Sequence, residues 1–529
     1  MKKMLKNALD KYLALFLVLV IITGVCLLFS SRKSGMFIDE IYTYGLSNSD
    51  HAPFLSDIKN GDMIGKTFTR EELLDYVMVD DDEGFDVGSV YYNQANDVHP
   101  PLYYWIFNAA STLERGSFSK WTGLKLDLLL YLVTVILLWK LSLRLFDSRF
   151  IAAAVTILYG VSILGTSTML MIRMYVLLTL LTVWLAYLVT LQLTEPSWKP
   201  AILTGVCIFL GLMTQYYFVF YAFFLCAFYV VHRLVNRQFK EALRFSLCAF
   251  AGVGLLLIVF PYCLTHLFAD KLVSGGNAVE NLTAFSQYAF RFSRFIGETR
   301  HGLKAAILVA LAAAVLLLVF SRKLRLQVKL GSLRFDSLLI ILPAYITFVV
   351  VTIISPVDEV RYIYNIAPIL VLTVGFLLYL LDKALWVYNS DRIRYAALAL
   401  IAALAVWEAR CAPPAYLYPE YVQYDALVSE HSASPCVYFN DNEFSSMTQD
   451  LQQLLFFKDV YVTDKEHFDA FTDYVGNSDE FVAYFDISEF WGSGYKPEEI
   501  IPQIAAATEY KNVRLLYENG LSCAYIISK

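Results

Sequence analysis

The feature that most constrains this chain is a series of long apolar runs, each close to the length that a helix needs to cross a lipid bilayer. A spanning helix takes about 20 predominantly apolar residues, and a window of that length identifies about eleven candidate spans. They cover residues 12–30, 124–146, 150–170, 174–193, 200–215, 216–232, 245–266, 303–320, 337–355, 362–381 and 395–410. Only 17% of the 529 residues are charged, against about 25% in soluble domains. We therefore expect a polytopic α-helical membrane protein.

Lysine and arginine positions predict the orientation of these spans. Basic residues gather at the N-terminus and in alternate connections, which the positive-inside rule assigns to the cytoplasm. They include Lys2, Lys3, Lys6, Lys11, Arg144, Arg149, Arg233, Arg237, Lys240, Arg244, the basic run 321–335, Arg392 and Arg394. The outer side then receives the loop 31–123, the loop 267–302, the turn "SPVDEVRYIYN" and everything after residue 411. Because the run 12–30 lacks a signal-peptide cleavage pattern, we expect it to be retained as the first span of a plasma-membrane protein.

The first outer loop, residues 31–123, is expected to hold short helices. In "TREELLDYV", Thr69 precedes Glu72 by three residues, which is the spacing of a capping box at a helix start. In "LYYWIFNAASTL", residues 102–113, apolar and aromatic residues recur at helical spacing after two prolines. That segment is too short to span a bilayer, so we expect a helix that lies in the membrane interface.

After the last span the composition becomes that of a soluble domain. Short apolar runs alternate with stretches of helical pattern, which is typical of a small α/β domain. The expected strands are "CVYFN", "KDVYVT", "EFVAYF", "VRLLYE" and "CAYIIS". We therefore divide the chain into a transmembrane domain, residues 1–410 including the loop 31–123, and an extracytoplasmic α/β domain, residues 411–529. The sequence of this domain contains no glycine-rich phosphate loop, so nucleotide binding is not indicated.

Polar residues of the outer side suggest a chemistry for the transmembrane domain. Asp39 and Glu40 are adjacent just after the first span, and His99 follows Asp97 at the end of the first loop. Arg173 and Arg361 stand near the outer boundary in this topology, as does Tyr362. Transfer of a group from a lipid phosphate needs a base for the acceptor proton and cations for the departing phosphate. Each residue alone also fits an ordinary loop acid or an arginine that reaches lipid head groups, so the hypothesis rests on their combination.

Four motifs, taken in order, resemble bacterial GT-C glycosyltransferases of the family 39 type, relatives of protein O-mannosyltransferases and of the lipid A aminoarabinose transferase. They are "FIDEIYTY" after the first span, "DVHPPLYYW" at the end of the first loop, "RMYVLLTLL" opening the fourth span and "VRYIYNIAPIL" opening the tenth. The resemblance covers about residues 12–380. It implies inverting transfer of a sugar from a polyprenyl-phosphate donor to an acceptor on the extracytoplasmic face.

The resemblance also implies roles for individual residues. Asp39 is the acid expected to activate or bind the acceptor, and Glu40, its neighbour in the same motif, is expected to be catalytic as well. His99 and Arg361 are expected at the donor phosphate. Asp97, Arg173, Tyr175 and Tyr362 stand in the same motifs and are expected to bind substrate, with no firmer role.

Several alternatives stay open from the sequence. A transporter or lipid flippase is also polytopic, although it usually places ionisable residues within its spans. A non-catalytic scaffold with an outer sensory domain is the other alternative.

No cofactor is indicated with certainty. A divalent cation held by adjacent acids is conceivable, but no metal-ligand set is complete. The expected acceptor is a hydroxyl of a protein, lipid or glycan, and membrane lipids are expected around the spans. The net charge of −6 gives no indication of binding to nucleic acid.

Overall fold

The chain divides by compactness into two units. The computed structural model describes residues 2–80, 84–268, 280–320, 335–384, 390–440, 445–465, 467, 470–488 and 494–529. The first unit contains Met1–Ser31, Val98–Tyr103 and Leu124–Ala415, and the second contains Arg32–Asp97, Tyr104–Gly123 and Tyr416–Lys529. Most of the basic run 321–335, on which part of the predicted orientation depends, lies outside the described residues.

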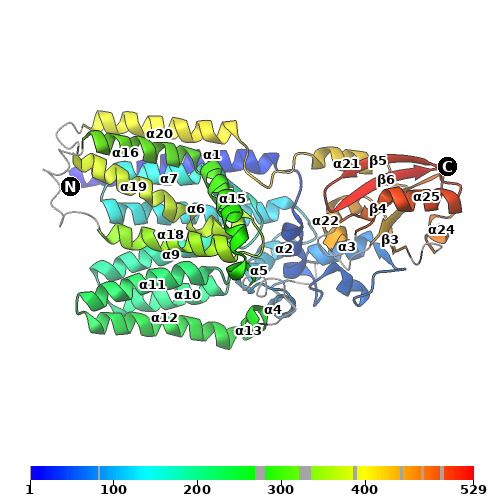
Figure 1. Cartoon of the computed structure of the whole chain (residues 1–529), viewed down its shortest axis with the longest axis horizontal. Helices are drawn as coiled ribbons and strands as arrows, with labels where there is room; N and C mark the ends of the chain where they lie inside the picture. Colours follow the sequence, from blue (N-terminus) through cyan, green and yellow to red (C-terminus); the bar gives the residue numbers. More distant parts are fainter. Residues whose placement is uncertain are drawn as a thin grey trace. The chain divides into compact units, whose positions relative to one another are not determined.

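The first unit is helical, and its long helices run alongside one another with α15 set across them (Figure 1). Its helices are α1 (Lys2–Arg32), α6 (Lys120–Phe146), α7 (Arg149–Gly160), α8 (Ile163–Leu170), α9 (Tyr175–Thr194), α10 (Trp198–Leu212), α11 (Phe218–Val235), α12 (Phe239–Val259), α13 (Cys263–Phe268), η2 (Phe285–Gln287), α15 (Tyr288–Gly302), α16 (Lys304–Val319), α18 (Phe335–Ile354), η4 (Val360–Ile366), α19 (Ala367–Ala384) and α20 (Asp391–Cys411). The apolar runs of the sequence thus form the expected helices.

The structure does not confirm the expected count of eleven spans. Among the described residues, seven helices are long and apolar enough to cross a membrane, or up to nine if each of two bent pairs is one span. The remaining two predicted spans are α10, which has only 15 residues, and α20, whose 21 residues carry five charged side chains. The protein is a multi-pass membrane protein whose exact number of spans is not fixed by helix length alone.

Two of these spans are broken, and one buried acid contacts both breaks. The axes of α7 and α8 differ by 57°, and those of α15 and α16 by 88°. Glu408 of α20 is buried, and its carboxylate accepts the backbone N–H groups of Lys304 (3.1 Å) and Ala305 (2.7 Å) at the start of α16. The backbone of Ile163, at the start of α8, bonds the same carboxylate. Glu408 therefore satisfies helix N-termini that the bends leave without intrahelical partners.

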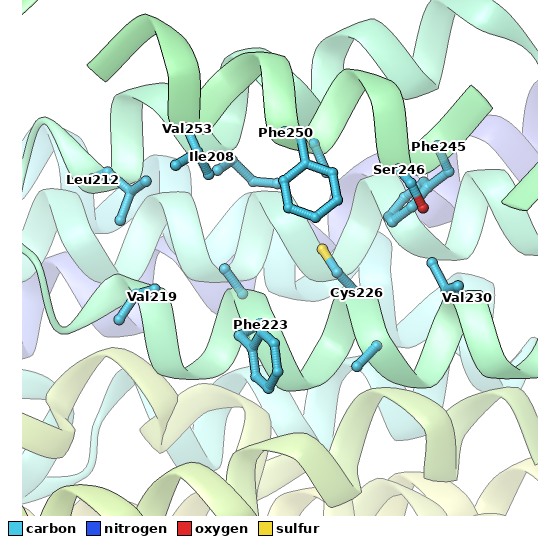
Figure 2. A pocket seen from close by; sticks show the side chains of 13 residues that line it. Ile208, Leu212, Val219, Phe223, Cys226, Val230, Phe245, Ser246, Phe250 and Val253 are labelled. Atoms are coloured by element: carbon cyan, nitrogen blue, oxygen red, sulfur yellow. The ribbon is translucent and has the colours of Figure 1, made fainter. Parts of the chain in front are cut away.

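Helices α10 and α12 cross in direct backbone contact. A Cβ on Gly205 of α10 would stand 2.3 Å from the carbonyl oxygen of Cys248, and one on Gly252 of α12 would stand 2.2 Å from that of Gly205. Small residues at such crossings let membrane helices approach closely. Beside this crossing, α10, α11 and α12 enclose an apolar pocket of about 290 Å³, where Phe250, Cys226 and Phe223 face the space (Figure 2).

The second unit combines short helices with one sheet (Figure 1). From the first loop it takes α2 (Ile38–Asn48), η1 (Leu55–Lys59), β1 (Thr67–Thr69), α3 (Arg70–Val77), α4 (Val87–Asn96) and most of α5 (Leu102–Thr112). From the C-terminal part it takes α21 (Tyr421–Ser429), β2 (Cys436–Phe439), α22 (Ser445–Gln449), α23 (Leu451–Leu454), β3 (Asp459–Thr463), α24 (Ala470–Val475), β4 (Glu480–Asp486), α25 (Pro497–Ala507), β5 (Asn512–Glu518) and β6 (Ser522–Ser528). The predicted capping box is present, since Thr69 Oγ1 accepts the N–H of Glu72.

The six strands lie in the order β1-β3-β2-β4-β6-β5. The central strand β2 pairs in parallel with β3 and β4, and the outer pairs are antiparallel. One face carries an apolar core in which Phe439 stacks on Phe485 at 4.8 Å, covered by α24 and α25. Alternate side chains of the same strands point to the other face, where Tyr438 stacks on Tyr484 and donates to the buried Asp450 at 2.9 Å. Strands β2 and β4 are buried on both faces, as central parallel strands are.

The first loop is joined to the C-terminal sheet rather than forming an appendage of the spans. Strand β1 pairs with β3, with Phe68 opposite Val460. The sequence placed residues 31–123 in the transmembrane domain, whereas by compactness most of this loop groups with Tyr416–Lys529. Strand β1 contributes to this grouping by pairing with a strand about 390 residues later, and so do bonds such as that from Gln449 Nε2 to the backbone oxygen of Met36 at 3.1 Å.

Candidate functional site

The candidate residues fall into both units of the fold. Asp39, Glu40 and Asp97 belong to the second unit. His99, Arg173, Tyr175, Arg361 and Tyr362 belong to the first. The geometry of each group is therefore described within its own unit.

The two adjacent acids of the first loop have different environments. Both lie in the first turn of α2. Glu40 is fully buried, and its Oε2 accepts the backbone N–H of Phe37 at 2.7 Å, which closes the N-terminus of the helix. Asp39 is half-buried.

Glu40 is also one half of a buried ion pair. Lys33 Nζ lies 2.9 Å from Glu40 Oε2, and both side chains are 0% exposed. The same ammonium group donates to the backbone oxygen of Tyr416 at 2.6 Å and lies over the ring of Tyr418 at 5.4 Å. Lys120 in turn bonds the backbone oxygen of Lys33. Glu40 thus has a structural task within the motif that the sequence assigned to catalysis.

This arrangement bears on the divalent cation that the sequence left open. Oε2 of Glu40 already accepts bonds from Lys33 and from the backbone N–H of Phe37. Within the described ranges, no group of three or more His, Cys, Asp or Glu side chains is placed to hold a metal ion.

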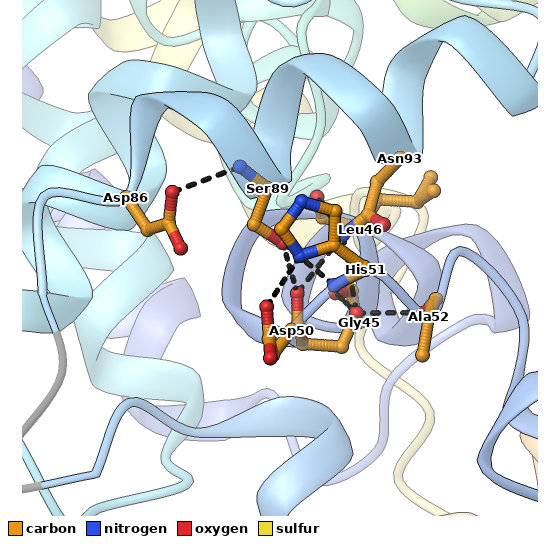
Figure 3. Close-up of polar contacts among 9 residues, drawn as sticks. Gly45, Leu46, Asp50, His51, Ala52, Asp86, Ser89 and Asn93 are labelled. Atoms are coloured by element: carbon orange, nitrogen blue, oxygen red, sulfur yellow. Dashed lines mark hydrogen bonds and ion pairs between the residues drawn. The ribbon is translucent and has the colours of Figure 1, made fainter.

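A polar network fixes α2 against α4, and Figure 3 shows its members. Ser89 Oγ accepts the backbone N–H of His51 and donates to the backbone oxygen of Ser49, each at 2.8 Å. Asn93 donates to the backbone oxygens of Leu46 (3.3 Å) and Ser49 (3.0 Å). His51 has a left-handed backbone with φ of 50°. These bonds hold the C-terminal end of the helix whose first turn carries Asp39.

The segment of His99 is anchored where the chain enters the first unit. His99 is half-buried and precedes the buried Pro100. The backbone N–H of Leu102 donates to the oxygen of Met213 at 3.0 Å, just after α10. Tyr103 donates to the buried Asp127 of α6 at 2.8 Å. These two bonds tie the segment that follows His99 to α6 and to the end of α10.

The two motifs that open the predicted fourth and tenth spans are brought together in the first unit. Tyr175, at the start of α9, contacts the ring of Tyr364 in η4 with centroids 6.1 Å apart. Tyr362 of η4 packs on Tyr217, whose ring centroid lies 5.1 Å away. Arg173 is buried, with 4% of its surface exposed. The segment that contains Arg173 and Tyr175 and the segment that contains Arg361 and Tyr362 are therefore neighbours, as a shared site requires.

Arg361 stands at a charged turn. Its Nε lies 2.8 Å from Glu359 Oε2, and its guanidinium lies 5.7 Å from the ring centroid of Tyr362. A second arginine meets the same turn, since Arg291 of α15 lies 3.1 Å from Asp358 Oδ1. The turn and α15 line a polar pocket of about 410 Å³.

Sequence reasoning missed Arg291 and the aromatic turn before α11. Arg291 lies in a loop that was assigned only a side of the membrane, although its sequence "RFSRF" interleaves arginine with phenylalanine. In the turn, Tyr217 contacts Tyr362, and Tyr216 bonds His266 Nδ1 at 2.9 Å. His266 is buried and stands at the end of an apolar run, and a histidine in that position was the sequence signal for a polar contact there.

The fold and this distribution of charged residues define a multi-pass membrane protein with a small C-terminal sheet domain, the architecture that the resemblance to the GT-C class predicts. Residues 98–264 match the family model described as dolichyl-phosphate-mannose-protein mannosyltransferase. This match confirms the expected resemblance to glycosyltransferases of that class. A comparison with curated protein sequences gives no match.

Solved structures show the same fold. ArnT from Cupriavidus metallidurans in the apo state is 12% identical with a TM-score of 0.51, over 97% of both chains. The structure of that protein bound to undecaprenyl phosphate is 13% identical with a TM-score of 0.50, again over 97% of both chains. The apo oligosaccharyltransferase of Archaeoglobus fulgidus is 10% identical with a TM-score of 0.50, over 90% of this chain and 69% of that chain. At these identities the likeness establishes the architecture.

Proposed function

We propose that this protein transfers a sugar from a polyprenyl-phosphate donor to an acceptor hydroxyl, with inversion, on the extracytoplasmic face of the membrane. The observation that carries the proposal is the meeting of Arg361 and Arg291 at one turn of a unit built from apolar helices. A lipid phosphate keeps its tail among apolar side chains and needs cations at its head group. The structure of ArnT with undecaprenyl phosphate supports this class of donor.

In the proposed reaction, Asp39 accepts the proton of the acceptor hydroxyl. The acceptor oxygen forms a bond to the anomeric carbon from the face opposite the phosphate. The bond between that carbon and the phosphate oxygen breaks, and polyprenyl phosphate leaves with the electron pair. Arg361 and His99 stabilise the charge that develops on the phosphate, which lowers the barrier because this charge is largest in the transition state.

The remaining residues have supporting roles in this proposal. Asp97, Arg173, Tyr175 and Tyr362 bind substrate, and Glu40 positions the helix turn that carries Asp39. The acceptor is a hydroxyl of a protein, lipid or glycan. The N-terminus is cytoplasmic, and the loop 31–123 and the domain 411–529 are extracytoplasmic, so a cysteine introduced near Gly61 should be labelled from outside intact cells. Protection of that cysteine would reverse the orientation.

The test is turnover by the purified full-length protein with a synthetic polyprenyl-phosphate sugar. Asp39→Asn should lower release of polyprenyl phosphate by at least about a hundredfold, the usual effect of losing a general base. Asp62→Asn is the matched control, because Asp62 is an exposed acid of the same loop and should leave turnover unchanged. Arg361→Lys keeps the charge without the planar fork and should be partly active, whereas Arg361→Ala should be nearly inactive.

Two outcomes would contradict the proposal. Direct use of the matching nucleotide sugar would remove the lipid donor, and full activity of Asp39→Asn would remove the base. A transporter or flippase predicts instead that reconstituted vesicles move a lipid or solute without breaking a glycosidic bond. A scaffold predicts that Asp39→Asn and Arg361→Ala are both without effect in cells.

A further inference from the structure

The turn formed by residues 356–359 holds two arginines from different elements, and the two ion pairs differ. Arg291 is fixed: its Nε donates to the backbone oxygen of Thr352 at 2.9 Å, and its guanidinium donates to Ser355 Oγ at 2.7 Å. Its side chain is only 4% exposed, and it pairs with Asp358 at 3.1 Å. With backbone and hydroxyl acceptors already arranged around it, Arg291 is part of the frame of the turn.

The second ion pair, between Arg361 and Glu359, is placed so that another anion can replace the carboxylate. Arg361 is 11% exposed and its partner Glu359 is 39% exposed. Ion pairs that reach solvent in this way contribute little to stability, at most about 1 kcal/mol. The backbone of Glu359 forms the turn through its N–H to Val357 oxygen (2.9 Å) and its oxygen to the N–H of Tyr362 (3.4 Å). The carboxylate is therefore free to move without breaking these backbone bonds.

Glu359, the partner of Arg361, also lines the polar pocket beside this turn. Its lining includes Asn281 and Gln287, the cations Arg291 and Arg294, and the carboxylates of Asp358 and Glu359. The charges of the lining balance, so a phosphate that enters the pocket adds negative charge beside an existing carboxylate. Phosphate matches the planar fork of arginine at least as well as a carboxylate does. The two anions compete for one guanidinium.

We propose that Glu359 is a counter-anion for Arg361 that the donor phosphate displaces, so that the Arg361 guanidinium is closed to phosphate until this carboxylate moves. This inference rests on the proposed function and adds a regulating residue to that site. Its consequence is unusual for a residue beside a ligand: removing the Glu359 charge should tighten phosphate binding. Arg361 would then meet the ligand without first giving up a partner.

The experiment measures binding of undecaprenyl phosphate to the full-length protein in detergent, at low ionic strength. Glu359→Gln should bind about threefold to fivefold more tightly than wild type, the factor that corresponds to losing a partly exposed ion pair. The gain should shrink in 0.5 M salt, because exposed charges are screened. Glu280→Gln is the matched control: it removes one exposed acid from the same unit outside the pocket and should not change affinity.

A double-variant comparison isolates the pair. In an Arg361→Ala background, Glu359→Gln should give no gain, because the competition has no cation left to act on. Inorganic phosphate should compete with undecaprenyl phosphate more effectively in Glu359→Gln if the head group alone is recognised. Unchanged or weaker binding by Glu359→Gln, or an equal gain from Glu280→Gln, would overturn the inference while leaving the donor class intact. Absence of undecaprenyl phosphate binding by wild type would overturn both.

Discussion

Replacing Glu40 by glutamine should destabilise the protein rather than remove a catalytic group. Lys33 and Glu40 are both fully buried, and their charges lie 2.9 Å apart. Breaking a buried pair by neutralising one partner costs about 3–5 kcal/mol, because the other charge stays buried without compensation. Here the amide oxygen of glutamine still accepts one bond, and Lys33 keeps the oxygen of Tyr416 at 2.6 Å. We therefore expect the lower end, about 3 kcal/mol.

The assay is thermal unfolding of the purified protein, followed by tryptophan fluorescence. For a cooperative unit of this size, 3 kcal/mol corresponds to a midpoint lower by about 6–12 °C. Lys33→Met should destabilise in the same way, and the double variant should recover much of the loss, since a buried pair can be replaced by apolar side chains at little cost. Asp39→Asn is the matched control and should melt like wild type. Equal melting of Glu40→Gln and wild type would refute the reasoning.

Two further predictions concern other buried acids. Burial raises the pKa of Asp450 to about 6 from an ordinary 3.8, against bonds from Tyr438 and Asn519 that act the other way. The folded state therefore holds the Asp450 proton more tightly than the unfolded state does. The stabilisation by protonated Asp450 is complete below pH 4 and falls by up to about 3 kcal/mol as the pH rises through 6. The melting temperature of wild type should accordingly fall relative to that of Asp450→Asn from pH 5 to pH 7. A pH-independent difference would contradict this assignment. Glu408→Gln places an NH₂ group among N–H donors, so amide hydrogen exchange should accelerate at both Ile163 and Ala305; acceleration at one position alone would separate the two helix breaks.

The sequence predicts the helical framework well because that framework depends on local composition. A run of about 20 apolar residues must satisfy its backbone within itself in a membrane, and only a helix does so. The breaks escaped prediction because their causes are not local. The bend before α8 begins at Ser162, whose hydroxyl accepts the N–H of Gly165, but the carboxylate that bonds the backbone of Ile163 comes from Glu408.

The C-terminal strands were predicted from their apolar patterns, and all five are present with nearly the expected bounds. Strand β1 was not, because three residues carry no periodic pattern and acquire strand geometry only by pairing with β3. The candidate site shows the same division. The motif containing Asp39 and Glu40 was recognised, but burial alone distinguishes the two acids. Lys33, seven residues before Glu40, was the signal that a buried pair was present.

The crossing of α10 and α12 has an evolutionary consequence. Each glycine leaves no room for a side chain because the other helix's backbone fills the space, so Gly205 and Gly252 are constrained jointly and not one by one. A substitution at either position forces the helices apart and relaxes the demand on the other. Among relatives of this chain, the two positions should accordingly change together: both small where the helices touch, and both free to enlarge in lineages where the pair has separated.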